Sequence, residues 1–278
     1  MASEENTRVG ASEATGETVG ASEATGETAG ASEATGEAGD TQDEQEAESP
    51  QDTADSPSDT ASAPALITAA GLGVDGEHGP LFSGIDLELS SGFHAIQMPG
   101  GPGQTALLLT IAGRYKPSHG TLTVLGDTGP RAIRKHCAIA AFDDIDELDE
   151  SVKVKTVLAE QRRWLAPWYS RVPLDAGQVE LDLVFGEIAP PSPDTFIVEL
   201  SDLELFLLRI TLALLSGRPI LVVGDLEQVR DVARRAVAVE RLGAIAERFT
   251  VIVGVTNPLG VEAPDHGLHD HRTLNGKD

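Results

Sequence analysis

The sequence contains one cysteine, little positive charge and no long uncharged hydrophobic run. The single cysteine, Cys137, excludes an internal disulfide and favours a reducing compartment. Lysine and arginine number 20 against 45 aspartate and glutamate residues, which gives a formal net charge of −25. This excess of negative charge argues against nucleic acid as a partner and against electrostatic docking on anionic lipid. The most apolar long stretch, residues 196–215, carries four charged side chains, which argues against direct membrane insertion.

Residues 1–64 differ in composition from the rest of the chain. The sequence ASEATGE recurs with a ten-residue period at 11–20, 21–30 and 31–40. The segment holds 16 acidic residues against one arginine, and it contains no Leu, Ile, Phe, Trp or Tyr. Such a segment cannot bury enough apolar surface to offset the entropy lost on ordering, so we expect a disordered acidic tail. It also lacks the apolar core of a secretory signal, and we therefore expect a cytoplasmic protein.

We expect residues 65–278 to form one folded domain with a polar C-terminal end at about 260–278. Apolar runs that lack alternation indicate strands buried on both faces, and their alternation with helical segments indicates an α/β fold with a mainly parallel sheet. One helical segment, 201–215, is apolar all round, so it is either fully buried or in contact with another protein. We expect strands at 65–72, 81–89, 92–98, 137–142, 219–224 and 250–255, an edge strand before Gly126, and helices at 105–114, 156–165, 201–215 and 229–248.

An apolar strand, a turn rich in glycine and proline, and an apolar helix follow one another within residues 95–109. Glycines at such a turn let successive backbone N–H groups converge on an anion at the helix N-terminus. The usual pattern is G-x-x-x-x-G-K-[ST]. Here Met98 replaces the first glycine and Gln104 replaces the lysine, whereas Gly103 and Thr105 are kept. The frame of a phosphate loop is therefore present without the positive charge that holds phosphate.

With these segments placed, the chain from Ala65 to Pro258 resembles the ATP-binding domain of ABC transporters. The resemblance rests on the order and spacing of four segments besides the phosphate loop. Residues 109–120 resemble the stretch that follows that loop, and residues 200–204 lie where the signature L-S-G-G-Q belongs. Residues 213–225 resemble the run into the Walker B acid, and residues 250–257 resemble the strand that usually ends in Thr-His.

The resemblance implies a P-loop NTPase-like sheet with covering helices, an N-terminal antiparallel portion and a small helical subdomain at about 156–205. It also implies ATP and Mg²⁺ as cofactors, with Thr105 and Asp225 as the Mg²⁺ ligands. The implied nucleotide-binding positions are Gly100, Gly101, Gly103, Gln104, Thr105, Ala106 and Ser201.

Most positions that carry catalysis in this family have changed. Leu226 stands where the family has its catalytic glutamate, and Asn257 stands where it has its switch histidine. In the signature, Asp202 and Leu203 replace the two glycines, and Glu204 replaces glutamine. We therefore assign no catalytic residue and expect an ABC-type ATPase fold that is catalytically inactive.

Nucleotide affinity should be low for three further reasons. Pro102 removes a backbone donor from the phosphate loop, and residues 74–76 hold no aromatic side chain to stack on adenine. The family's Mg²⁺-contacting glutamine aligns with Asp143 or Asp144. A charge-assisted hydrogen bond contributes about 1.5–3 kcal/mol and a base–aromatic stack about 1–3 kcal/mol. An ordinary site has about 8 kcal/mol of binding energy. Losing the charge-assisted hydrogen bond of the lysine and the aromatic stack on adenine leaves roughly millimolar affinity.

Other polar and aromatic groups admit two interpretations each. Six acidic residues within 143–150 resemble a calcium loop only loosely, and a solvated acidic surface is favoured. Glu227 lies one position beyond Leu226 and is disfavoured as a replacement catalytic acid. Histidines and aspartates within 265–271 suggest either a transition-metal site or, as favoured, a polar chain end. The aromatic residues within 164–169 belong either to the core or to a surface that faces a partner.

The resemblance supports a degenerate ATP-binding subunit with weak or no ATP binding and little or no hydrolysis. Such a subunit would act as a structural or regulatory partner of an integral membrane transport subunit, and it would form a homo- or heterodimer with another ABC domain. Its location would be cytoplasmic and peripheral to the inner face of the cell membrane. Two alternatives stay open at this stage, which are a divergent but working transport ATPase and a nucleotide-free interaction module on an ABC fold.

Overall fold

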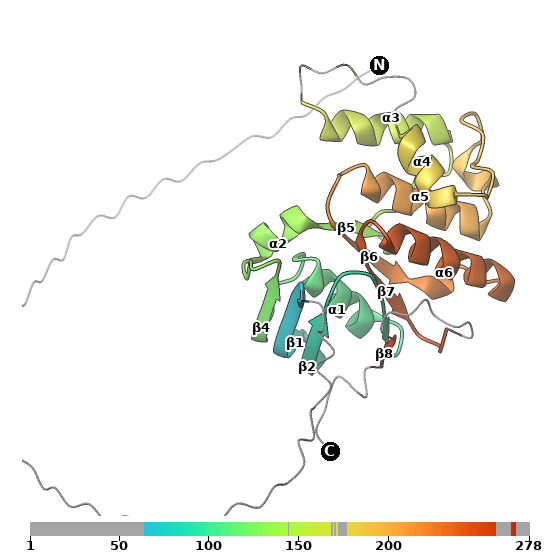
Figure 1. Ribbon diagram of the computed structural model, residues 1–278. Coiled ribbons are helices and arrows are strands. Elements are labelled where there is room, and N and C mark those ends of the chain that lie inside the picture. Colours follow the sequence, from blue (N-terminus) through green and yellow to red (C-terminus); the bar gives the residue numbers. More distant parts are fainter. Residues whose placement is uncertain are drawn as a thin grey trace, which may run out of the picture. The chain divides into compact units, whose positions relative to one another are not determined.

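The computed structural model describes residues 64–259, apart from 144, 168, 170 and 172–176, together with the backbone of residues 268–270 (Figure 1). The predicted acidic tail up to residue 63, and the side chains of the histidine-containing segment 265–271, lie outside the described residues. Within the described part of the chain, no helix combines the length and the apolar character needed to cross a membrane.

An antiparallel sheet of three strands opens the fold, in the order β2-β1-β4. Its centre is β1, in which Ile67 pairs with Leu89 on one side and with Val124 on the other. Inward-facing apolar side chains alternate with exposed ones along β2, as expected for a sheet with one buried face. The strands are β1 (Ile67–Gly76), β2 (Gly79–Leu89) and β4 (His119–Val124).

The strands predicted at 65–72 and 81–89 pair with each other, but the turn between them is shorter than expected, because β1 and β2 extend and pair as far as Gly76 and Gly79. The glycines that suggested a turn instead allow close strand approach. A Cβ at Gly73 would lie 3.2 Å from the carbonyl oxygen of Phe82, which leaves little room for a side chain.

A second sheet is parallel throughout, in the order β5-β6-β7-β3-β8. Every residue of β7 is buried, which explains why its sequence shows no alternation. Together with the antiparallel sheet, this arrangement confirms the predicted α/β class. The strands are β3 (Phe93–Gln97), β5 (Cys137–Ala140), β6 (Ile220–Asp225), β7 (Thr250–Val255) and β8 (Leu268–Asp270).

Helix α1 packs on both sheets, and its side chains share one hydrophobic cluster with strands of each. Proline occupies the first turn of α1 and of α2, where its missing N–H breaks no helical hydrogen bond. Helix α2 was not predicted. The helices are α1 (Pro102–Ile111), α2 (Pro130–His136), α3 (Val154–Leu165), α4 (Gln178–Phe185), α5 (Asp202–Leu214) and α6 (Val232–Ala246), with single 3₁₀ turns η1 (Ile197–Glu199) and η2 (Leu226–Gln228).

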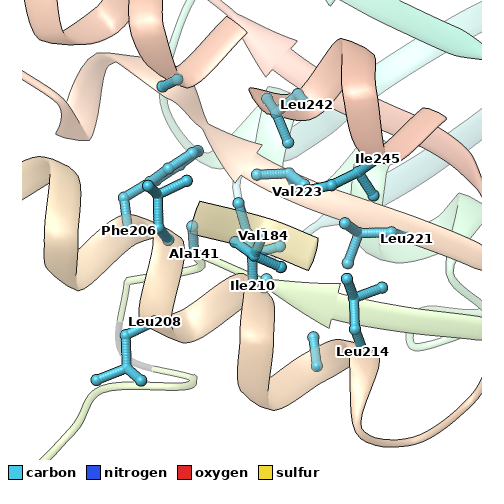
Figure 2. Packing of buried hydrophobic residues seen from close by; sticks show 14 of the residues in the cluster. Ala141, Val184, Phe206, Leu208, Ile210, Leu214, Leu221, Val223, Leu242 and Ile245 are labelled. Carbon is cyan, nitrogen blue, oxygen red and sulfur yellow. The ribbon is translucent and has the colours of Figure 1, made fainter. Parts of the chain in front are cut away.

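The main hydrophobic cluster explains the apolar character of α5 on all sides (Figure 2). Phe206 and Ile210 are buried beside Val184 of α4, and the same cluster includes Val223 of β6 and Leu242 of α6. Burying a side chain of this size contributes about 1.5–3 kcal/mol. Helix α5 is therefore a core helix, which confirms the first of the two alternatives for it.

Two of the aromatic residues that follow the buried part of α3 do not belong to the core. Trp164 is 86% exposed and Tyr169 is 75% exposed. The buried face of α3 consists of Val154, Val157 and Leu158 instead. The core interpretation of this aromatic segment is wrong for Trp164 and Tyr169, and Trp168 lies outside the described residues.

Candidate functional site

The phosphate loop (residues 98–105) connects β3 to α1 and leaves the N-terminus of α1 open. Gly101 precedes the helix with φ 117°, a conformation that favours glycine, and no side chain caps the helix. No acidic residue lies in the first turn of α1. The first backbone N–H groups of a helix lack partners within it, so an uncapped first turn presents donors to an anion. Pro102 reduces their number by one.

Two glycine positions of this loop leave no room for a Cβ unless the neighbouring atoms shift. A Cβ at Gly100 would lie 2.7 Å from Oγ1 of Thr256, and a Cβ at Gly103 would lie 2.6 Å from the carbonyl oxygen of Leu81. The loop therefore packs directly on the residue after β7 and on β2. These contacts hold the loop geometry without any ligand.

Gln104 aligns with the lysine of the usual phosphate-loop pattern, and its side chain folds back onto the loop. Its side chain is 1% exposed, and Nε2 donates a hydrogen bond to the carbonyl oxygen of Met98 at 3.3 Å. A Cβ at Gly254 would lie 3.1 Å from Cδ of Gln104, so β7 confines the amide from the other side. The uncharged amide of Gln104 thus donates its hydrogen bond to the loop backbone itself.

The predicted Mg²⁺ ligands Thr105 and Asp225 line one cavity of about 330 Å³. That volume is at the lower end of the range for small-molecule sites. Four other predicted residues do not line this cavity, which are Gly100, Gly103, Ala106 and Ser201. Ala106 is buried in α1, and Ser201 precedes α5. The full lining is Leu81, Gly101, Pro102, Gln104, Thr105, Tyr115, Ala141, Phe142, Asp143, Asp225 and Gln228.

Asp225 and Glu227 connect the end of β6 to the end of β7. The carboxylate of Asp225 accepts a hydrogen bond from the backbone N–H of Glu227 at 3.0 Å. The carboxylate of Glu227 accepts from the backbone N–H and the side-chain amide of Asn257, at 2.9 and 3.0 Å. The intervening Leu226 is fully buried. Glu227 is therefore held by Asn257, and it is not among the residues that line the cavity.

The pKa values of the two carboxyl groups are shifted in opposite directions. Burial, and a hydrogen bond to Glu227, raise the pKa of Asp225 to about 6. Burial also opposes ionisation of Glu227, but hydrogen bonds from Asp225, Asn257 and Thr256 outweigh it and lower the pKa of Glu227. A proton shared by the pair therefore resides on Asp225. Above about pH 6 both groups are ionised, and Asp225 is available to a cation.

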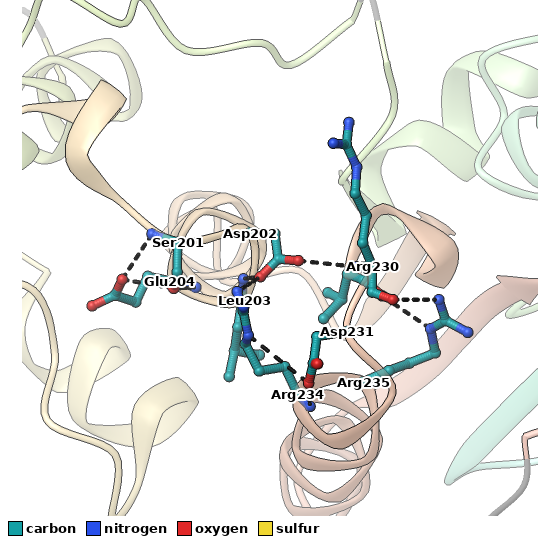
Figure 3. A network of polar contacts seen from close by, with 9 residues as sticks. Ser201, Asp202, Leu203, Glu204, Arg230, Asp231, Arg234 and Arg235 are labelled. Atoms are coloured by element: carbon teal, nitrogen blue, oxygen red, sulfur yellow. Dashed lines mark hydrogen bonds and ion pairs between the residues drawn. The ribbon is translucent and has the colours of Figure 1, made fainter.

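The first turn of α5, the signature position, is closed by its own side chains (Figure 3). Oγ of Ser201 accepts the backbone N–H of Glu204 at 3.3 Å. In return, Oε2 of Glu204 accepts the backbone N–H of Ser201 at 2.8 Å and its hydroxyl at 2.7 Å. This is a complete capping box, in which each side chain satisfies the other's backbone.

Asp202 adds a third carboxylate contact at the same helix end (Figure 3). It accepts backbone N–H groups from Leu203 at 2.8 Å and Arg230 at 3.0 Å, and it forms an ion pair with Arg234. Burial opposes its ionisation, but these donors lower the pKa of Asp202. At the α5 N-terminus, carboxylates accept the backbone N–H groups of Ser201 and Leu203, and the Ser201 hydroxyl accepts that of Glu204. At the α1 N-terminus no side chain caps the helix.

Comparisons with known proteins find similar folds among solved structures. No family model matches the sequence, and no curated protein matches it. Among solved structures, the chain is similar to a putative ABC transporter ATP-binding protein from Pyrococcus furiosus at 18% identity, with 75% of this chain and 98% of that chain covered and a TM-score of 0.59. It is also similar to cbiO1 from Clostridium perfringens, part of the ABC transporter complex cbiONQ, at 17% identity, with 70% and 79% covered and a TM-score of 0.57.

A third similar structure is the ADP conformation of MJ1267, an ATP-binding cassette of an ABC transporter, at 14% identity, with 76% and 88% covered and a TM-score of 0.59. The chain has the fold of an ABC-transporter ATP-binding cassette. At these identities the likeness establishes the architecture, which includes the parallel sheet, the N-terminal antiparallel sheet and the covering helices.

Within this cassette fold, the sequence analysis missed a buried polar network centred on Arg209 of α5. Its guanidinium binds both carboxylate oxygens of Asp146 and donates further hydrogen bonds to the carbonyl oxygen of Phe142 and to Oε1 of Gln228, each at 2.7 Å. Asp146 also accepts the backbone N–H groups of Ala141 and Phe142, at 2.8 and 2.7 Å. Gln228 donates to the carbonyl oxygen of Ala141 at 2.7 Å.

This network corrects the interpretation of residues 143–150 as a uniformly solvated surface, because Asp146 is an internal partner of Arg209. The network also fixes the start of the loop after β5 through Ala141 and Phe142. The resemblance aligns Asp143 or Asp144 of this loop with the glutamine that contacts Mg²⁺. Among the described residues, no group of acidic, histidine and cysteine side chains could hold a metal ion by itself. One signal was available, because a lone arginine in an apolar helix has to find a buried acceptor.

Proposed function

We propose that the chain is a degenerate ABC-type ATP-binding subunit, with weak nucleotide binding and no hydrolysis. It would serve as a structural or regulatory partner of an integral membrane transport subunit and would pair with another ABC domain. The observation that carries the proposal is the closed N-terminus of α5, where Asp202 and Glu204 already engage the donors of the signature position. A phosphate approaching this helix would meet carboxylates.

The residues around Thr105 fit Mg²⁺ and a phosphate group better than they fit adenine. Thr105 supplies a hydroxyl and Asp225 a carboxylate to one cavity, and oxygen ligands are those that Mg²⁺ prefers. The open first turn of α1 supplies backbone donors for an anion. Bound Mg²⁺ would neutralise phosphate charge that the missing lysine leaves uncompensated. These features support retention of weak Mg²⁺–nucleotide binding over a nucleotide-free interaction module.

The groups expected to activate water are absent from the positions that resemble the family's. Leu226 is fully buried, and an aliphatic side chain cannot accept a proton. Glu227 is engaged by Asn257, so it is not free to replace the missing acid. These contacts favour the hypothesis of an inactive subunit over that of a divergent working ATPase.

Calorimetric titration of the full chain with ATP, with and without Mg²⁺, tests the proposal. We expect millimolar binding that strengthens with Mg²⁺ and that Asp225→Asn weakens. Phosphate release from ATP should be the same for the unaltered chain and for Asp225→Asn. Turnover that this substitution abolishes would establish the divergent ATPase, and the absence of binding at millimolar ATP would establish the interaction module.

A further inference from the structure

One region of this acidic chain is almost without acidic residues. From Leu89 to Phe142 the sequence contains a single acidic residue, Asp127, although the whole chain has 45. Within the same region, five basic residues follow the apolar part of α1 and continue through α2. They are Arg114, Lys116, Arg131, Arg134 and Lys135.

The fold brings two arginines of this region, Arg114 and Arg134, close to a third, Arg218, which follows α5. A Cβ at Gly113 would lie 2.6 Å from the carbonyl oxygen of Pro130, so the residue before Arg114 packs directly on the first residue of α2. Arg134 lies in the last turn of α2, and Arg218 donates to the carbonyl oxygen of Cys137, which follows that helix, at 3.0 Å. We call Arg114, Arg134 and Arg218 the arginine patch.

The charge of the arginine patch is not neutralised by any described carboxylate, since none of its members takes part in an ion pair there. The nearby Asp127 is already bound to His136, with Nε2 and Oδ2 2.7 Å apart. Burial lowers the pKa of Arg114, and the like charges of Arg218 and Arg134 lower it further. Arg114 and Arg134 are nevertheless exposed, so an external anion can reach them.

We propose that the arginine patch binds an acidic peptide segment, of the kind that residues 1–63 of this sequence supply. A guanidinium presents paired donors that match a carboxylate, and several arginines together favour a segment with repeated Asp and Glu over a single ion. Residues 1–63 contain 16 acidic residues against one arginine. Charge complementarity within one chain is the argument for this occupant, and no residue of the phosphate loop enters it.

The start of the described chain supports the same occupant. The carbonyl oxygen of Leu66 accepts the backbone N–H of Leu125 at 2.8 Å, and Val124 bridges to Asp127, shortly before α2 begins. The chain therefore enters the fold beside the segment that leads into the arginine patch. A short tether raises the effective concentration of a weak ligand to about the millimolar range.

A simpler role for these arginines is to stabilise the C-terminal ends of α1 and α2, where cations are favourable by about 0.3–1 kcal/mol each. That role predicts a loss of stability on neutralisation and no effect on peptide binding. The test therefore measures binding and stability separately.

The probe is a fluorescent peptide of residues 31–60, which contains ten acidic residues. It is titrated by anisotropy against a full chain whose own acidic residues within 31–60 are changed to Asn and Gln. We expect binding at 50 mM salt that weakens at least tenfold at 300 mM, since surface charge pairs are screened. The triple change Arg114→Gln, Arg134→Gln and Arg218→Gln should weaken it at least tenfold.

A matched control removes the same charge from exposed arginines elsewhere, through Arg163→Gln, Arg171→Gln and Arg248→Gln. The control should bind the peptide as the parent does. Equal binding by both triple variants, or no binding at low salt, would overturn the proposal. Circular dichroism and thermal unfolding of each variant verify that the fold is intact.

The unaltered chain then shows where the natural segment comes from. If its own segment occupies the arginine patch, added peptide binds more weakly at every protein concentration. If segments exchange between copies, the weakening grows with protein concentration and larger species appear on sedimentation. Both results support the proposal, whereas peptide binding that is the same with and without the native acidic residues overturns it.

Discussion

The guanidinium of Arg209 holds the carboxylate of Asp146 through two hydrogen bonds, Nη2 to Oδ1 at 2.6 Å and Nε to Oδ2 at 3.1 Å. This pair connects the core helix α5 to the loop after β5, and Gln228 extends the connection to η2. In this protein the loop is fixed from within by a side chain that is 7% exposed.

Arg209→Met should destabilise the protein markedly. The change leaves Asp146 charged and partly buried, and it removes a donor from the carbonyl oxygen of Phe142 and from Gln228. Breaking a buried ion pair from one side costs roughly 3 kcal/mol, which corresponds to a fall in Tm of about 6–12 °C in a domain of this size. Chemical unfolding in urea measures the difference. The exposed Arg248→Met is the control, and a similar effect of both changes would show that the pair contributes nothing specific.

Ser201→Ala separates a structural role from a nucleotide-binding role at the signature position. Because Oγ of Ser201 caps α5, its loss should lower the free energy of unfolding by about 1 kcal/mol. ATP affinity measured by calorimetry should stay unchanged, since the carboxylates of Asp202 and Glu204 remain at this helix end and repel phosphate. Weaker ATP binding with unchanged stability would instead assign Ser201 to the nucleotide site.

Asp225→Asn should remove a dependence of stability on pH. The pKa of Asp225 in the folded protein, about 6, lies above its ordinary value of 3.8, so the folded state holds the proton more tightly than the unfolded state. The stabilisation from the protonated group is complete below about pH 4 and is lost as the pH rises through 6. An asparagine can still accept from the backbone of Glu227 and does not ionise.

Thermal unfolding from pH 4 to 8 in the presence of a chelator tests this expectation. The unaltered protein should lose stability relative to Asp225→Asn as the pH rises from 4 to 7, and the variant should be the more stable one at pH 7.5. Parallel curves for the two proteins over this range would contradict the raised pKa.

The sequence predicts much of the fold because its strong signals are local. The strand at 250–255 is a continuous apolar run with clear flanks, and its predicted bounds match β7. The phosphate loop is also local, and its strand–turn–helix frame is confirmed. The strands of the β1–β2 hairpin were predicted too short, because glycines that usually mark turns here permit close strand contact.

The candidate site was less predictable, because its contacts join distant segments. Arg209 and Asp146 are 63 residues apart, and no local pattern identifies one as the partner of the other. The roles of Asp202 and Glu227 likewise depend on Arg234 and Asn257, which lie on other elements. Replaced motif residues could be read from the sequence, but the internal contacts that now engage them could not.

Gln104→Lys tests whether the phosphate loop is still an anion site that lacks only its charge. The loop backbone is held by contacts at Gly100 and Gly103 that do not involve this side chain, and the first turn of α1 is open. A lysine there can donate to the carbonyl oxygen of Met98 in place of the glutamine amide, or extend toward phosphate in the cavity. We expect ATP affinity to rise about ten- to hundredfold, which corresponds to about 1.5–3 kcal/mol.

Two controls identify the cause of such a gain. The gain should shrink with added salt if the new charge is responsible, and Gln104→Met should show none. Phosphate release should not appear, because Leu226 and Asn257 are unchanged. If Gln104→Lys leaves ATP binding undetectable at millimolar nucleotide while the variant remains folded, the missing donor at Pro102 or the side chain at Met98 has closed the loop to phosphate. The fold would then act through its surfaces and not through a nucleotide.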